Sequence, residues 1–103
     1  MEMAMAWTID DSQPRILYNK DKHVAVTPSA MGKYHEWRRE IERGSDPKSA
    51  AGKVGDMHYE QLSGNNKGIY TIRLSQEHRV AFTINGTLQQ VKVISIGGHF
   101  PPS

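Results

Sequence analysis

The chain has 103 residues, 37% of them hydrophobic, which fits one domain with one modest core. It has no cysteine, which excludes a disulfide framework, a thiolate nucleophile and a cysteine-ligated zinc site, and no run approaches the roughly 18 apolar residues of a membrane span. The net charge is only +2, but from Gln61 onward four basic residues accompany one acid, whereas the first sixty residues carry nine basic and ten acidic ones. We therefore expect a soluble cytoplasmic protein without a membrane partner, whose C-terminal half attracts a polyanion or merely carries solvated charges.

The N-terminal residues 1–22 are the least regular part of the sequence. A weak strand-like patch at residues 16–18 is accompanied by turn-forming residues at Asp10, Asp11, Ser12 and Pro14. We expect an N-terminal extension that forms a turn or irregular arm. Residues 23–27 then alternate enough for a short strand at the start of the domain, residues 23–103.

A helix is predicted to begin after residue 27. Thr27 is a typical N-cap, Pro28 fits the first helical position, and Gly44 is a natural stop. A stripe with helical spacing follows, which we interpret as core packing rather than a binding surface: Ala30, Tyr34, Trp37 and Ile41. The next segment, residues 45–56, contains proline and glycine and is expected to be a loop with at most one short helical stretch.

From Ile69 onward the hydrophobic period changes to two, which predicts three antiparallel strands. Asn85-Gly86 predicts a two-residue hairpin turn that would pair Val80 with Val91. In this register Val91, Val93 and Ser95 face the core, and Lys92 does not. The predicted fold is an α+β domain with a short N-terminal strand and one main helix packed on a twisted antiparallel sheet.

The register of the first two of these strands decides which side chains share the open face of the sheet. A connecting loop with an odd number of residues would bring Ile72 and Val80 together on the core face, since a slip of one residue would expose such side chains. Arg73 and Arg79 would then share the opposite, open face. Two guanidinium groups on one face form a plausible phosphate clamp, and two solvated arginines are the alternative.

Several segments resemble the RelE/ParE toxin superfamily, and most closely its YoeB-like branch. The stretches that carry the resemblance are Val24-Ala-Val-Thr-Pro-Ser-Ala30, Tyr59-Glu-Gln-Leu-Ser-Gly64, Lys67-Gly-Ile-Tyr-Thr-Ile-Arg-Leu-Ser-Gln-Glu-His-Arg-Val-Ala-Phe82 and Val93-Ile-Ser-Ile-Gly-Gly-His-Phe100. Together they cover residues 23–100. The Gly-Ile-Tyr-x-Ile-Arg-Leu and Glu-His-Arg parts are specific in combination, whereas the terminal His-aromatic pair alone is weak.

The resemblance implies a metal-independent, cofactor-free RNA endonuclease in which a 2′-hydroxyl attacks the adjacent phosphate and expels a 5′-hydroxyl. Counted back without a gap from the Glu-His-Arg motif, the base of the family falls on Glu60. Its phosphate-binding arginine falls on Arg79 and its C-terminal acid on His99, whose imidazole titrates near neutral pH. The basic and aromatic residues expected to bind RNA are Lys67, Arg73, Lys92 and Phe100.

Each of these roles has a structural alternative. Glu60 is also an ordinary solvated carboxylate, and His99 also caps the end of the sheet. His78 belongs to the motif, but a turn contact fits it better than chemistry does. The histidines at 58, 78 and 99 lack the tight spacing of metal ligands, so no metal site is predicted.

The sequence departs from the family pattern at its end and in its helical region. Phe100 replaces a tyrosine, which removes a hydroxyl but leaves a ring that can stack on an unpaired base. One long helix is expected where many relatives have a helical hairpin. A break in strand alternation at Gly97-Gly98 is predicted to turn His99 toward Arg79.

The sequence is compatible with three functions. The first is an RNA endonuclease toxin that acts on mRNA at the ribosome or on tRNA and is neutralised by a cognate antitoxin. The second is a ParE-like inhibitor that binds DNA gyrase without catalysis, and Glu60, Arg79 and His99 favour the nuclease over it. The third is a toxin domain released from a larger secreted effector and neutralised by an immunity protein, which the N-terminal extension allows.

Overall fold

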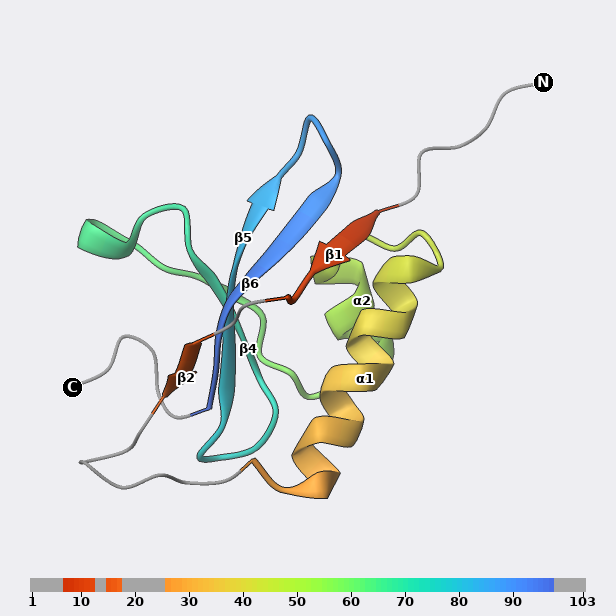
Figure 1. The fold of residues 1–103 in the computed structure, drawn as a ribbon, viewed down its shortest axis with the longest axis vertical. Helices are drawn as coiled ribbons and strands as arrows, with labels where there is room; N and C mark the ends of the chain where they lie inside the picture. The colour runs from red at the N-terminus through yellow and green to blue at the C-terminus, as the bar shows by residue number, and fades with distance from the viewer. Residues whose placement is uncertain (1–6, 13–14, 18–25, 98–103) are drawn as a thin grey trace.

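The computed structural model of the chain describes residues 7–12, 15–17 and 26–97, in which two helices pack on one face of a β-sheet (Figure 1). The elements are β1 (Thr8–Asp10), β2 (Arg15–Leu17), α1 (Pro28–Glu42), α2 (Pro47–Val54), β3 (Glu60–Gln61), the 3-10 turn η1 (Gly64–Asn66), β4 (Tyr70–Arg73), β5 (Arg79–Asn85) and β6 (Gln90–Gly97). The strand order is β1-β6-β5-β4-β3, and β2 also pairs with β6. The expected α+β class is confirmed.

The sheet is mixed and not antiparallel throughout as the sequence predicted. Strand β1 runs parallel to β6 with Thr8 opposite Gln90, and β2 does so with Arg15 opposite Ser95. Both strands belong to the segment expected to be an irregular arm, because three residues are too few to show an alternating pattern. Their main chains cover an edge of β6 that would otherwise be unpaired. Of the strand expected at residues 23–27, Val26 and Thr27 are described, and neither is in a strand.

Helix α1 forms as the sequence predicts. The Thr27 hydroxyl accepts a hydrogen bond from the Ala30 amide at 3.2 Å, and Pro28 is the first helical residue. The four residues of the apolar stripe are all buried. After the helix ends at Glu42, Gly44 adopts a φ of +115°, which a side-chain-bearing residue rarely tolerates.

A second helix, α2, replaces the expected loop, so the helical region is a hairpin and not one long helix. The Asp46 carboxylate accepts a hydrogen bond from the Ser49 amide at 2.9 Å, and Pro47 occupies the first turn. Both helices therefore begin with an N-cap residue that is followed by a proline. The sequence predicted at most a short helical stretch here, because Gly52 weakens the helix and because the helix depends on burial against α1.

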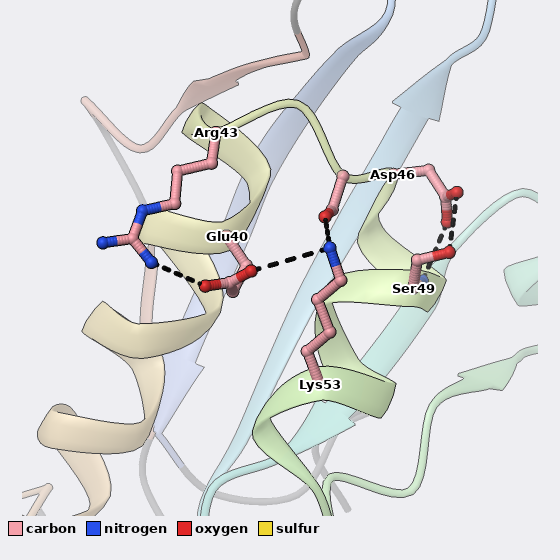
Figure 2. A network of polar contacts seen from close by, with 6 residues as sticks. Glu40, Arg43, Asp46, Ser49 and Lys53 are labelled. Carbon is pink, nitrogen blue, oxygen red and sulfur yellow. Dashed lines mark hydrogen bonds and ion pairs between the residues drawn. The ribbon is translucent and has the colours of Figure 1, made fainter.

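Polar contacts hold the two helices together at their outer side (Figure 2). Glu40 of α1 accepts a hydrogen bond from Arg43 at 2.9 Å and forms an ion pair with Lys53 of α2 at 3.8 Å. The Lys53 ammonium also donates to the Ser45 hydroxyl at 2.7 Å. Three of these side chains, Glu40, Arg43 and Lys53, help to line a cleft of about 390 Å³, and their charges are already paired within the chain.

The core lies between the helices and the sheet. The Trp37 and Phe82 rings contact each other with centroids 5.0 Å apart, and the Trp37 indole donates a hydrogen bond to the Pro47 carbonyl at 3.1 Å. Strands β4 and β5 contribute the buried residues Ile72, Val80 and Phe82 to this cluster. One face of β4 and β5 therefore packs against the helices, and the side chains on the other face point away from them.

The β5–β6 hairpin has a longer turn than predicted. Asn85 pairs with Gln90, so four residues connect the strands and Val80 lies opposite Ile96, not Val91. The side chain of Asn85 causes the difference, because its oxygen accepts a hydrogen bond from the Leu88 amide at 3.0 Å and closes the turn. Gln89 completes it with a φ of +50°.

A β-bulge in β6 changes the direction of the following side chains. Phe82 pairs with Val93 and Ala81 with Ser95, so Ile94 is the extra residue. Val91 and Val93 face the core as predicted, but Ser95 lies on the opposite face with Ala81. This break in alternation at Ile94 was not predicted, whereas the break predicted at Gly97-Gly98 involves residues outside the described part of the chain.

Candidate active site

Arg73 and Arg79 are direct partners across β4 and β5. The five-residue connection between these strands has an odd length, so both guanidinium groups lie on the face away from the helices, as the sequence predicted. Like charges directly opposite each other destabilise a sheet. The arginine pair is thus a local concentration of positive charge that packing alone does not explain.

Part of the Arg79 side chain supports the β4–β5 loop. Its Nη1 atom donates to the Ser75 carbonyl at 2.8 Å and makes longer contacts with the carbonyls of His78 and Gln76. Burial lowers the pKa of Arg79, Arg73 lowers it further, and Glu60 acts in the opposite direction. Within the described residues the remaining guanidinium nitrogens have no hydrogen bond, so one edge of the fork is available to an oxyanion.

Glu60 lies on the same face as the arginine pair. It is exposed on β3 and pairs with Thr71, which in turn pairs with Ala81 on β5. Because neighbouring strands are about 4.8 Å apart, β3 and β5 are separated by roughly 10 Å, with Arg79 two residues along from Ala81.

The face is less open than expected. Thr71, Ala81 and Ser95 form a row across its centre and are at most 5% exposed. The Ser95 hydroxyl is buried and has no hydrogen-bond partner in the described part of the chain. Buried hydroxyls are usually hydrogen-bonded, so this group stands out beside the arginine pair.

Asp56 is a site residue that sequence reasoning missed. Its carboxylate lies 3.7 Å from the Arg73 guanidinium and 4.0 Å from the Lys33 ammonium. Asp56 and His58 have φ values of +56° and +45°, a backbone strain that often occurs at functional sites. The sequence placed Asp56 at the end of an expected loop, but only the fold brings it to Arg73.

Two predicted RNA-binding lysines lie away from the arginine pair. Lys92 is exposed and opposite Thr83, which is four residues along β5 from Arg79, a separation of about 13 Å. Lys67 follows η1 in the β3–β4 loop, which projects away from both helices (Figure 1). Lys92 shares the face of Arg79, whereas Lys67 is at the opposite end of β4 from Arg73. His99 and Phe100 lie outside the described residues.

His78 has the turn contact that the sequence favoured. Its buried imidazole lies with Nδ1 2.7 Å from the Ser75 hydroxyl, and its main chain closes the turn with Ser75. In the described ranges, no three His, Asp or Glu side chains gather as ligands for a metal ion. No described helix is long and apolar enough to cross a membrane.

The described part of the chain therefore combines a helical hairpin with a sheet that ends in an antiparallel meander. The solved structure of the YoeB dimer from Staphylococcus aureus shares this fold with a TM-score of 0.55 and 20% sequence identity, covering 91% of this chain and 98% of that one. The YoeB/ParE toxin from Agrobacterium tumefaciens is 24% identical, with 84% and 99% coverage and a TM-score of 0.43. A YoeB-YefM complex from Staphylococcus aureus gives 20% identity, 86% and 100% coverage and a TM-score of 0.40. Family models and curated sequences gave no match.

The shared fold confirms the fold expected from the motifs. The similarity covers nearly the whole of both chains, so the helical hairpin and the meander belong to one common architecture. At 20% identity, the comparison shows a shared architecture and not a shared chemistry.

Proposed function

We propose that this chain is a growth-arresting toxin that cleaves RNA and is neutralised by a cognate antitoxin or immunity protein. The observation that carries the proposal is the opposed pair Arg73 and Arg79 with the Glu60 carboxylate on the same face. Two cations in one place suit a phosphate, and a carboxylate beside them suits proton abstraction. The substrate is mRNA at the ribosome or tRNA in the cytoplasm.

The proposed reaction needs neither metal nor cofactor. Glu60 takes the proton of the 2′-hydroxyl, whose oxygen then bonds to phosphorus. The guanidinium of Arg79, with Arg73 beside it, stabilises the negative charge that accumulates on the phosphorane oxygens. His99 gives a proton to the 5′-oxygen as its bond to phosphorus breaks. The products are a 2′,3′-cyclic phosphate and a 5′-hydroxyl.

The connection of β6 to the arginine pair supports the role of His99. Gly97 lies directly opposite Arg79 and has a φ of +138°. His99 follows Gly97 by two residues in the sequence, and we propose it as the group that protonates the leaving oxygen of a phosphate held by Arg79.

The other predicted residues would bind the flanking parts of the RNA. Lys92 continues the cationic face along β5, and Lys67 would contact a more distant phosphate. Phe100 would stack on an unpaired base.

Separate incubations of the purified protein with total RNA, with ribosomes carrying mRNA and with DNA gyrase test the proposal. We expect new RNA ends in one of the first two reactions and unchanged supercoiling in the third. Inhibition of gyrase without RNA cleavage would replace the nuclease by a ParE-like inhibitor.

A further inference from the structure

A groove runs between α2 and the strained turn that leads into β3. Ala51 and Met57 are buried in its floor, and half-buried Tyr59 and exposed His58 form one wall. The other wall is the face of α2 that carries Lys48 and Gly52, which are four residues apart and therefore neighbours on the helix surface. Its volume of about 310 Å³ is at the lower end for small-molecule sites, which fits one planar ring system.

Gly52 keeps this groove open without a packing reason. A glycine inside a helix costs about 1 kcal/mol relative to alanine. A Cβ atom at Gly52 would meet no heavy atom within 4 Å, so no neighbour requires the missing side chain. A larger side chain here would extend over the groove, and its absence leaves the ring of Tyr59 accessible from the α2 side.

Asp56 links the groove, which lies on the helix side of the sheet, to the arginine pair on the other face. It lines the groove and its carboxylate lies 3.7 Å from the Arg73 guanidinium, at the edge of the sheet. A nucleotide whose phosphate lies at the arginine pair therefore has its neighbour within reach of the groove. Lys48 at the rim adds a cation for the phosphate of that neighbour, and Tyr59 and His58 offer rings to its base.

We propose that this groove binds one unpaired nucleobase of the RNA next to the cleaved linkage. The inference rests on the proposed function and adds a subsite to it. Tyr59 provides the stacking surface, supported from behind by Tyr70 and Phe82, whose ring centroids lie 5.8 and 6.2 Å from its own. The groove would accept any flat base, because stacking distinguishes poorly between bases.

The test is the substitution Gly52→Leu in the full chain, with Gly32→Leu as the matched control. Gly32 is also an exposed helical glycine with open space around it, but it is not among the residues that line the groove. Both substitutions should raise the denaturation midpoint, since leucine is the better helix former. The probe is a short single-stranded RNA in which every 2′-hydroxyl is methylated, so that it binds but is not cleaved.

We expect Gly52→Leu to raise the Kd of this RNA by about five- to 150-fold, the range of about 1–3 kcal/mol for stacking one base. Gly32→Leu should leave the Kd unchanged. One abasic position in the RNA should cause a similar loss with the wild-type protein and no further loss with Gly52→Leu. Tyr59→Leu, which removes the ring without filling the groove, should behave like Gly52→Leu and serves if that variant does not fold.

The outcomes separate the two proposals. If the wild-type protein binds the RNA and both folded variants bind it equally well, the groove is not a base-binding site and the proposed function stands. If the wild-type protein does not bind the RNA, the proposed function fails and the subsite fails with it. If Gly52→Leu loses binding of a partner protein while RNA binding is unchanged, the groove is a protein-docking surface and the inference is overturned.

Discussion

Arg73 and Arg79 lie directly opposite each other on neighbouring strands, and each carries a full positive charge on the same face of the sheet. Their repulsion opposes folding, as the lowered pKa of Arg79, caused first by burial and then by Arg73, also indicates. A sheet selected for stability alone would not place two cations here. The pair therefore points to a role in binding an anion.

Replacing Arg73 should separate stability from activity. We expect Arg73→Thr to raise the free energy of unfolding by about 0.2–1 kcal/mol, because it removes a like-charge cross-strand pair and introduces a good strand former. The ion pair lost with Asp56 is exposed and contributes little. RNA cleavage should fall in the same variant. Urea denaturation and a cleavage assay check both, and a less stable protein with full activity contradicts the prediction.

Arg79→Ala should abolish growth arrest and lower the cleavage rate by about 100- to 1000-fold, the usual cost of losing one transition-state contact. Because the substitution also removes the hydrogen bond from Arg79 to the Ser75 carbonyl, we expect the free energy of unfolding to fall by about 1–2 kcal/mol. Arg39→Ala, at an exposed position of helix α1, is the control. Growth arrest by a folded Arg79→Ala protein would remove Arg79 from the mechanism.

Two carboxylates near the arginine pair have to be distinguished. If Glu60 is the base, Glu60→Gln should lower the cleavage rate by about 100-fold or more, and Asp56→Asn should change it by less than about tenfold. Asp56→Asn should act through Arg73 and therefore raise KM more than it lowers kcat. Steady-state kinetics of both variants decide the assignment, and the reverse pattern would make Asp56 the base.

The ends of the products report the reaction type. Attack by the neighbouring 2′-hydroxyl leaves a cyclic phosphate and a 5′-hydroxyl, and the reaction should proceed unchanged in EDTA. Labelling of the new 5′ ends with a polynucleotide kinase, without prior phosphatase treatment, checks this. Ends that carry a 5′-phosphate, or activity that depends on added Mg²⁺, point to another class of nuclease.

Helix α2 should lose stability at low pH through its cap. Hydrogen bonds from Ser49 hold the pKa of Asp46 below its ordinary value of 3.8 in the folded chain. Stability from this group is present above the unfolded pKa and is lost as the pH falls through the lower, folded pKa. Asp46→Asn keeps a neutral cap and should remove this part of the pH dependence. Chemical denaturation between pH 5 and 2 measures it, and identical profiles would contradict the prediction.

The sequence by itself determined those elements whose signals are local. Thr27-Pro28 and the buried stripe specify α1, and the alternation from Ile69 onward specifies the meander, because capping and hydrophobic period act within one element. Burial of Ile72 and Val80 on one face requires an odd number of residues between β4 and β5. This requirement was enough to predict Arg73 and Arg79 together on the other face, since side chains alternate along a strand.

The tertiary structure decided what depends on contacts between distant segments. Strand β1 and helix α2 are too short to stand alone and form by pairing with β6 and by burial against α1. The bulge at Ile94 brings Ile96 opposite Val80 and moves Ser95 from the predicted core face to the arginine face. Asp56 reaches Arg73 only because α2 and β3 hold both ends of its turn, a relation in space that no spacing in the sequence contains.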